Sequence, residues 1–350
     1  MRPLVKTLSL EAIKHNLSVL QALASPAQLV VVVKANAYGH DAVAVASVIP
    51  EQVSLAVACL EEALVLREAG FRHEIWLLEG IFSAEESALC AMHDLVVCVH
   101  QMRQLEWLAN SRYPHKLWIK LDSGMHRLGF LLDDKRWQSA LAQNPQLQCL
   151  GIMSHFACAD EEDLSHARTQ LDLLHQSALP YPRSFCNSAA LLRLPEARAD
   201  VVRAGLALYG ILPYDDKQSA LHPALRLETE MIAVRYLRAG ENAGYGRHFT
   251  APHDGYLATI ALGYGDGFPR AIESGKVKVY WQSKQRRVPL VGRVSMDMSL
   301  VWLGEQSALE GEKIVIFGEE NPIEQLAKEA NTIPYTLCTM LTSRVALAVR

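Results

Sequence analysis

The chain has 350 residues, of which half are hydrophobic and 21% are charged, and its formal net charge is -4. This composition is ordinary for a folded protein with a sizeable core and argues against disorder. Because acidic and basic residues are interspersed, the chain lacks the basic stripe that binds nucleic-acid phosphates, and we expect no nucleic-acid partner. The length suits one barrel of about 250 residues and a smaller domain.

No stretch of the sequence offers about 18 uninterrupted apolar residues, and the first residues lack the apolar core of a signal peptide. We therefore expect a cytoplasmic protein with no membrane partner. The seven cysteines are odd in number and form no C-x-x-C pair, which argues against a disulfide framework and a zinc site. We interpret most of them as small core residues and expect no metal.

Up to about residue 210, short apolar runs alternate with segments of helical spacing, such as residues 60–69, which Gly70 closes at the expected C-cap position. Continuous apolar runs are typical of strands covered on both faces, and eight strand and helix units favour a closed parallel barrel over an open sheet. The seventh run is short, and Arg203 interrupts the eighth. The expected strands are residues 29–33, 53–58, 74–78, 95–99, 117–121, 149–154, 184–186 and 201–204.

After about residue 225 the sequence changes to short β-rich runs separated by Gly and Pro, which indicates a second, mainly-β domain. A helix at 322–330 and a final run near 342–349 complete it, and the turn-rich residues 213–222 are the expected linker. We therefore predict an α/β fold, with a TIM-like (β/α)8 barrel at residues 1–222 and a C-terminal mainly-β domain at 223–350. The expected strands of the second domain are residues 229–237, 255–262, 277–281, 288–291, 299–303 and 313–317.

Lys34 directly follows the four valines that end the first barrel run. Reactive groups of a parallel barrel collect at the carboxyl ends of the strands, so this lysine is expected at the barrel mouth. One interpretation is a lysine whose amine simply reaches solvent. The other is a Schiff-base lysine, whose neutral amine attacks an aldehyde cofactor such as pyridoxal phosphate.

A pyridoxal phosphate site also needs a phosphate cradle, which barrels commonly build after strands seven and eight. Ser188 follows the seventh run, and Gly205 follows the eighth, where a glycine lets backbone N–H groups approach a phosphate. Ser188 would equally suit the N-cap of a helix.

Residues 33–40, VKANAYGH, closely resemble the cofactor-attachment segment of the alanine racemase family, whose members use pyridoxal 5'-phosphate. Further matches follow in order along the entire chain, and their combination is far more specific than any one of them. They are KLDSGMHRLG at 120–129, SHF at 154–156, NS at 187–188, VRAG at 202–205, GYG at 244–246, GYGDG at 263–267 and GRVSMD at 292–297.

The resemblance implies a racemase with two catalytic bases. Lys34 would hold the cofactor as an internal aldimine and move the α-proton on one face, and Tyr245 would act on the other, because inversion through a planar carbanion needs a base on each side. In this family the tyrosine comes from the β domain of the partner subunit, so a homodimer with shared active sites is expected. Without the other motifs, Tyr245 would be interpreted as a tyrosine in a Gly-flanked turn.

The resemblance also implies contacts to the cofactor. Arg203 would donate to the pyridine nitrogen, and because a guanidinium only donates, it would discourage protonation of that nitrogen and limit transamination. His155 would stack under the ring. By residue type alone, Arg203 would be a surface or salt-bridging arginine and His155 a core histidine. The residues expected at the phosphate are Tyr38, Ser188, Gly205 and Leu206.

For the substrate, Arg127 resembles the residue whose bidentate fork orients the phenolic base and the substrate carboxylate. Lys120 matches a lysine that is carbamylated in many relatives, and a plain ion-paired lysine fits as well. Tyr264 resembles a residue that lines the entrance. Met296 and Asp297 resemble second-subunit contributors to the substrate pocket, whereas a methionine is otherwise a common core filler.

Three positions depart from the family pattern. Ser184 stands where many relatives carry a histidine that braces the arginine, which leaves the brace of Arg203 open. Ala204 stands where a proline is usual, and Ser343 stands where some members have a phosphate-contacting tyrosine. None of the three replaces a proton-transfer residue.

The expected function is interconversion of L- and D-alanine, which would supply D-alanine for cell-wall peptidoglycan or serve D-alanine catabolism. The alternatives are a racemase of broader specificity, for instance toward serine, a decarboxylase with the same cofactor, and a non-catalytic cofactor-binding barrel. The motif around Tyr245 and the assignment of Arg203 argue against a decarboxylase. The second domain argues against the binding protein, which would not need it.

Overall fold

The computed structural model describes residues 2–212 and 220–350, and the chain divides into two compact units. The barrel unit comprises Ile13–Leu208 and Leu212–Leu221. The β unit comprises Met1–Ala12, Tyr209–Ile211 and His222–Arg350. Most of the expected linker, residues 213–219, lies outside the described residues.

Eight parallel strands form the barrel unit, in the order β10-β2-β3-β4-β5-β6-β8-β9. Beyond the ends of this path, the Arg203 N–H donates to the carbonyl of Cys186 at 3.2 Å and closes the barrel. All eight strands expected from the sequence are confirmed, and the short β7 (Phe130–Leu131) pairs with β6. The barrel strands are β2 (Gln28–Val32), β3 (Ser54–Val57), β4 (Ile75–Leu77), β5 (Leu95–Val99), β6 (His115–Asp122), β8 (Leu147–Met153), β9 (Arg183–Ser184) and β10 (Val201–Ala204).

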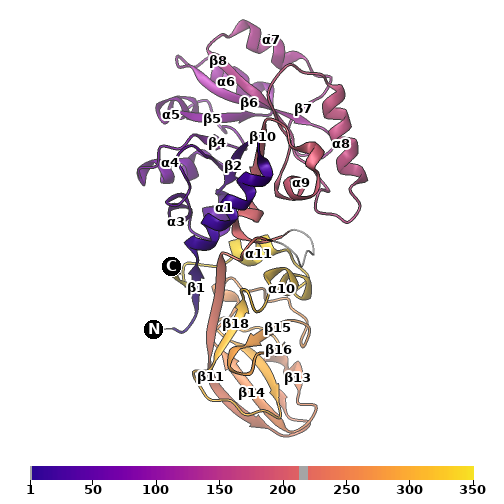
Figure 1. The fold of residues 1–350 in the computed structure, drawn as a ribbon. Coiled ribbons are helices and arrows are strands. Elements are labelled where there is room, and N and C mark those ends of the chain that lie inside the picture. Colours follow the sequence, from indigo (N-terminus) through magenta and orange to yellow (C-terminus); the bar gives the residue numbers. More distant parts are fainter. Residues whose placement is uncertain (1, 213–219) are drawn as a thin grey trace. The chain divides into compact units, whose positions relative to one another are not determined.

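Amphipathic helices alternate with these strands and lie around the outside of the barrel (Figure 1). In α4 (Leu60–Glu68), Leu60, Ala63 and Leu66 recur at helical spacing and are buried. Gly70, at φ +88°, ends this helix with its N–H bonded to the carbonyl of Arg67 at 3.0 Å. The other helices up to residue 193 are α1 (Leu10–Ala24), α2 (Lys34–Tyr38), α3 (Ala42–Ala46), α5 (Glu86–Met92), α6 (Met102–Ala109), α7 (Arg136–Gln143), α8 (Ser165–Gln176) and α9 (Ser188–Arg193).

The β unit is an eight-stranded sheet in the order β14-β17-β16-β15-β18-β11-β1-β19. Antiparallel pairing of β14 with β11 closes the strands between them into a second, antiparallel barrel. The six strands expected here are confirmed, although β11 begins four residues earlier than the sequence pattern indicated. They are β11 (Leu225–Leu237), β14 (Gly255–Ile260), β15 (Lys278–Trp281), β16 (Arg286–Val291), β17 (Ser299–Gly304) and β18 (Lys313–Phe317).

The start of the chain belongs to this second sheet. β1 (Val5–Leu8) pairs with β11 and with β19 (Ala346–Val349), whereas the division drawn from the sequence placed residues 1–222 together. A strand of four residues has too little pattern to reveal its partners. The expected helix is present as α10 (Ile323–Glu329), while α11 (Pro334–Thr339) and the hairpin of β12 (Asn242–Ala243) and β13 (Phe249–Thr250) were not anticipated.

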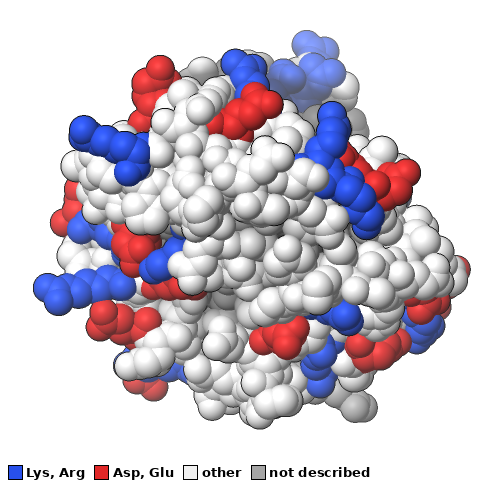
Figure 2. Space-filling model, turned by 90° about the horizontal axis from the view of Figure 1, so that it is seen from above, with Lys and Arg blue, Asp and Glu red and all other residues white. Residues whose placement is uncertain are grey.

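Charged side chains of both signs are interspersed on the face drawn in Figure 2, with uncharged surface between them. The described part of this face carries no continuous basic stripe of the kind that follows a nucleic-acid backbone. Within residues 2–212 and 220–350, no helix has both the length and the apolar character that a membrane crossing requires.

Candidate active site

Lys34 lies at the carboxyl end of β2, where the chain leaves the barrel wall in a left-handed turn. Ala35, Asn36, Ala37 and Tyr38 all have φ between 51° and 54°. Residues with a Cβ rarely adopt this conformation, which costs of order 1–3 kcal/mol for each of them. Such a turn persists only where its surroundings hold it, and it directs the chain away from the strand immediately after Lys34.

Backbone and side-chain hydrogen bonds brace the turn from its far end. The N–H of Gly39 donates to the carbonyls of Ala35 and Asn36 at 3.0 and 3.1 Å, and the N–H of Ala42 donates to Asn36 Oδ1 at 2.8 Å. Lys34 itself is half-buried. The lysine thus occupies a fixed position at the barrel mouth, as the sequence predicted.

Residues 38, 188 and 205 meet at one point of the mouth although they are far apart in sequence. A Cβ added to Gly205 would lie 2.5 Å from the Tyr38 hydroxyl, so only glycine fits there. Ser188 Oγ accepts from the N–H groups of Gly205 at 2.8 Å and Ala207 at 3.3 Å. Because this oxygen receives two donors, its own proton is directed elsewhere, and the cluster can offer hydroxyl donors to an anion.

The N-cap of α9 is Asn187, whose side chain accepts from the N–H of Ala190 at 2.9 Å. The interpretation of Ser188 as a helix N-cap is therefore wrong. Leu206 follows Gly205, is buried, and begins the 3-10 helix Leu206–Tyr209. All four residues expected at a phosphate thus belong to one cluster.

Arg203 is buried in the barrel, with only 4% of its surface exposed. One terminal nitrogen donates to the carbonyl and the hydroxyl of Ser184, at 2.6 and 2.8 Å, and the other donates to the carbonyl of Ser154 at 2.6 Å. Ser184 therefore supplies the brace that the sequence left open. No acidic residue of the described chain forms an ion pair with Arg203, so the salt-bridge interpretation is wrong.

The guanidinium keeps its charge in this setting. Burial lowers the pKa of Arg203 to about 10, which leaves the group protonated at neutral pH. None of the described residues accepts a hydrogen bond from its Nε. Arg203 thus presents one remaining donor from a rigid support of neutral oxygens.

His155 follows β8 and is half-buried, and its Nδ1 lies 3.4 Å from a terminal nitrogen of Arg203. Burial is the first cause that holds the pKa of His155 well below its usual value, and the positive charges of Arg203, Lys120, Arg127 and Lys34 add to it. The imidazole is therefore neutral at physiological pH.

Lys120 lies on β6 and is 8% exposed. Its pKa is lowered to about 8, first by burial and also by the cationic Arg203, Arg127 and Lys34, while Cys98 has an opposing effect. No carboxylate of the described residues pairs with this amine, so the interpretation of Lys120 as a plain ion-paired lysine is wrong. A buried amine with this pKa is partly neutral, and hence nucleophilic, near pH 8.

A hollow of about 200 Å³, which includes space open to solvent, lies beside Lys120 at the barrel mouth. Arg127 is exposed at its rim, and Ser154 and His155 line it as well. The barrel unit therefore gathers an amine, an imidazole, a guanidinium and hydroxyl groups around one opening. Nine predicted site residues are in this unit: Lys34, Tyr38, Lys120, Arg127, His155, Ser188, Arg203, Gly205 and Leu206.

The other four predicted site residues belong to the β unit. Tyr245 begins a short 3-10 turn, Tyr245–Arg247, between two glycines at φ 75° and 69°. Its side chain is 72% exposed, and no described residue hydrogen-bonds its hydroxyl. A large aromatic ring held out into solvent on a tight turn is available to a partner.

Tyr264, Met296 and Asp297 are brought together by two loops of the β unit. The N–H of Tyr264 donates to the carbonyl of Ser295 at 3.0 Å, and the N–H of Gly265 donates to that of Met296 at 2.8 Å. Tyr264 and Met296 are exposed, and the Asp297 carboxylate accepts from Arg344 at 2.6 Å.

Sequence reasoning missed the anchor of these loops. Asp266 is fully buried and forms an ion pair with Arg2, which also donates to the carbonyl of Asp297 at 2.6 Å. A charged residue between glycines in the GYGDG motif was the available signal, but its partner is 264 residues away in sequence.

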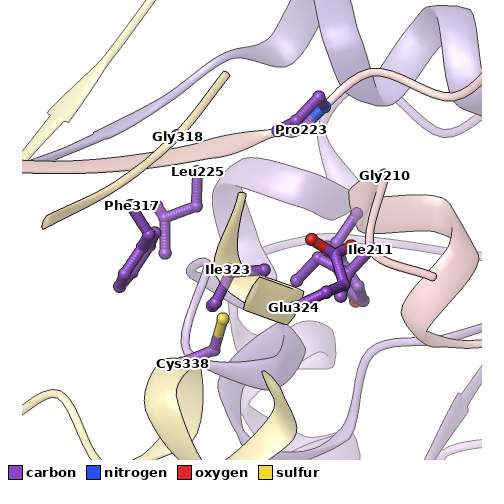
Figure 3. A pocket seen from close by; sticks show the side chains of 10 residues that line it. Gly210, Ile211, Pro223, Leu225, Phe317, Gly318, Ile323, Glu324 and Cys338 are labelled. Carbon is purple, nitrogen blue, oxygen red and sulfur yellow. The ribbon is translucent and has the colours of Figure 1, made fainter. Parts of the chain in front are cut away.

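A second hollow, of about 270 Å³ with its open space, lies within the β unit (Figure 3). Apolar side chains such as Leu225, Phe317 and Ile323 line it together with the thiol of Cys338. None of the predicted site residues lines it. The barrel mouth is therefore the candidate active site.

A closed parallel barrel whose mouth gathers a lysine, a buried arginine and hydroxyl groups defines an α/β-barrel enzyme. The family model "Alanine racemase, N-terminal domain" matches residues 8–213, and "Alanine racemase, C-terminal domain" matches residues 224–349. The chain belongs to the alanine racemase family.

Named alanine racemases are similar to this chain over its full length. The chain is 44% identical to the alanine racemase of Dichelobacter nodosus, over all of this chain and 99% of that one, and 41% identical to that of Aeromonas hydrophila, over 99% of each. The crystal structure of biosynthetic alanine racemase from Pseudomonas aeruginosa matches with a TM-score of 0.94 at 38% identity and full coverage of both chains. The alanine racemase from Bartonella henselae, with covalently bound pyridoxal phosphate, matches at 0.90 and 28% identity with the same coverage.

Proposed function

We propose that this protein is a pyridoxal-phosphate-dependent isomerase that interconverts L- and D-alanine. The observation that carries the proposal is the position of Lys34 at the barrel mouth, directly before the turn that delivers Tyr38 to Gly205 and Ser188. Family membership over the entire chain supports the reaction and the cofactor. Lys34, Tyr38, Ser188 and Arg203 would hold the cofactor.

The residues at the mouth fit this cofactor. The hydroxyl groups of Tyr38 and Ser188, which meet at Gly205, suit a phosphate, and the open Nε of Arg203 suits a pyridine nitrogen. The neutral His155 suits the face of a ring. When bound, pyridoxal phosphate supplies an electron-withdrawing ring that acidifies the α-C–H bond of an amino acid joined to it.

Proton transfer falls to two residues of the protein. Lys34 Nζ takes or returns the α-proton on one face of the substrate, and the phenolic oxygen of the partner subunit's Tyr245 does so on the other. Each base gains a proton in one direction and loses it in the reverse direction. The exposure of Tyr245 and the absence of a described partner for its hydroxyl support this role.

The guanidinium of Arg203 would donate a hydrogen bond to the pyridine nitrogen of the cofactor. A protonated guanidinium cannot accept a proton, so it holds the nitrogen that it contacts in the unprotonated state. The rigid contacts to Ser184 and Ser154 support this role because they fix the direction of Nε.

Lys120 and Arg127 would act together in binding the substrate. Carbamylation would join the neutral amine of Lys120 to carbon dioxide through a new N–C bond, with release of one proton, and would leave an anionic carbamate. The pKa of about 8 supports this chemistry because the neutral amine is the reactive form. The resulting anion would lie near Arg127, Lys34 and Arg203, none of which forms an ion pair with a carboxylate of the described residues. Arg127 would then be free to orient the substrate carboxylate.

Tyr245, Tyr264, Met296 and Asp297 of one subunit would complete the mouth of its partner, so the working unit would be a homodimer. The proposed division places a cofactor-binding barrel in residues 1–222 and the domain that supplies the second base in residues 223–350. We also propose a cytoplasmic enzyme that supplies D-alanine for peptidoglycan or serves its catabolism.

The test uses the purified chain loaded with pyridoxal phosphate. Incubation with L-alanine should yield D-alanine by chiral chromatography, incubation with D-alanine should yield L-alanine, and serine should turn over more slowly. Cofactor binding without stereochemical change in any amino acid would overturn the proposal in favour of a binding protein.

A further inference from the structure

We propose that Glu62 is the positioning residue that sets Lys34 at the barrel mouth, by holding the point where β2 breaks away from β3. The inference rests on the proposed role of Lys34. Glu62 lies in the first turn of α4, and its two carboxylate oxygens accept from two different backbone segments. Oε1 accepts from the N–H of Ala35 at 2.7 Å, and Oε2 accepts from the N–H of Ala58 at 2.8 Å.

The N–H groups of Ala35 and Ala58 are the next two donors of the β2–β3 ladder, which ends at this point. β2 and β3 pair in parallel up to Val32 and Ala56, and the N–H of Val33 still donates to the carbonyl of Ala56 at 2.8 Å. A continued parallel ladder would use the N–H groups of Ala58 and then Ala35. Both donate to Glu62 instead, so the carboxylate replaces the ladder just where the left-handed turn begins.

The replacement places the carboxylate next to Lys34 along the chain. Ala35 is the first residue with positive φ, and the turn continues through Tyr38. A hydrogen bond to an ionised acceptor is about twice as strong as a neutral one, so the two bonds can offset part of the cost of the strained residues. None of the ion pairs of the described residues includes Glu62, so its oxygens serve the backbone and not a cation.

The test compares Glu62→Gln with Glu61→Gln in the cofactor-loaded enzyme. The amide keeps one acceptor oxygen for one of the two backbone N–H groups. Its NH2 group faces the other N–H, so one hydrogen bond is replaced by a contact between two donors. Glu61 is a matched control because it lies in the same helical turn, carries the same charge, is exposed, and interacts with Cys59 and not with the turn.

For Glu62→Gln we expect kcat to fall about 10- to 100-fold while KM for alanine changes less than about threefold, because the lysine is displaced and the substrate contacts remain. We also expect an altered visible spectrum of the bound cofactor and at least about tenfold faster cofactor loss on dilution. Glu61→Gln should match the wild type in all of these. Unfolding midpoints measured in parallel separate a displaced lysine from a general loss of stability.

Wild-type kcat, spectrum and cofactor release in Glu62→Gln would overturn the inference and leave the proposed function standing. A wild-type enzyme that neither binds cofactor nor racemises alanine would instead overturn the proposed function. If Glu62→Gln yields no folded protein, Glu62→Asp, which keeps the charge but is too short to bridge both N–H groups, is measured in the same way. A kcat of Glu62→Asp within twofold of the wild type would then overturn the inference.

Discussion

Lys34 and Tyr245 have contrasting surroundings in the two units of the chain. Near Lys34, the side chains of Lys120, Ser188 and Arg203 are buried, Arg203 and Ser188 are hydrogen-bonded to the barrel, and Lys120 and the half-buried His155 have lowered pKa values. Tyr245 stands 72% exposed on a glycine-flanked turn with no described hydrogen-bond partner. Preorganised polar groups of this kind work best where water is excluded. The proposed homodimer would account for this contrast, because one chain would build the barrel mouth and the partner subunit would supply the tyrosine.

The largest loss of activity is expected from a substitution at Lys34, in the barrel unit. Lys34→Ala should lower racemisation by at least about 10⁴-fold, because both the anchor of the cofactor and one base are lost. The visible absorbance of covalently held cofactor should disappear from the spectrum. Lys14→Ala, on the exposed face of α1, is the control. Persistent absorbance in Lys34→Ala would remove this lysine from the site.

On the other side, Tyr245→Phe should keep the cofactor spectrum and lose about 10²- to 10⁴-fold in turnover, because only a proton-transfer group is removed. Tyr236→Phe, an exposed tyrosine of the same unit, should stay near the wild type. Normal turnover by Tyr245→Phe would exclude the phenol from the mechanism.

Mixing the two inactive variants sharpens this prediction. A heterodimer of Lys34→Ala and Tyr245→Phe subunits contains one site with both wild-type bases if sites are shared, so activity should partly return. Heterodimers that are proven by mass spectrometry and remain inactive would argue that each chain supplies its own tyrosine.

A smaller effect tests the cradle at the mouth. Gly205→Ala should weaken cofactor binding about 10- to 100-fold, because the new Cβ would lie 2.5 Å from the Tyr38 hydroxyl. Titration with pyridoxal phosphate measures it. In a Tyr38→Phe background the same substitution should cost less, since the hydroxyl is gone. Equal losses in both backgrounds would contradict the contact.

The smallest effect concerns the buried amine. With a pKa of about 8, against 10.5 for a free lysine, about half of Lys120 is neutral at pH 8 and almost none below pH 6. Because the folded state lowers this pKa, keeping the amine charged destabilises the folded state at low pH, and the free energy of unfolding rises as pH increases from about 8 to about 10.5. Bicarbonate at pH 8 should add about 1 kcal/mol, or roughly 1 to 2 °C in the unfolding midpoint of a chain of this length.

Lys120→Met is the control for this effect and should not respond to bicarbonate. An equal response of both proteins would show that bicarbonate acts elsewhere. Intact-mass analysis under native conditions provides an independent reading of the modification.

The barrel strands were predictable because continuous apolar runs such as 95–99 carry their pattern locally. The position of Lys34 was predictable because the end of a barrel strand defines the mouth. The β unit was predictable in its strands but not in its pairing with β1, since four residues at the start of the chain meet partners more than 200 residues away. Pairing at such distances is fixed by the whole sheet and not by local pattern.

By itself, the sequence determined the two kinds of sheet, the order of the elements and the residue types at the mouth, because hydrophobic period and short motifs are local properties. Only the tertiary structure decided that Ser184 braces Arg203, that Asn187 and not Ser188 caps α9, and that Glu62 accepts from the backbone beside Lys34. These contacts join segments that fold together in space, and hydrogen bonds depend on direction and on distances of a few ångströms.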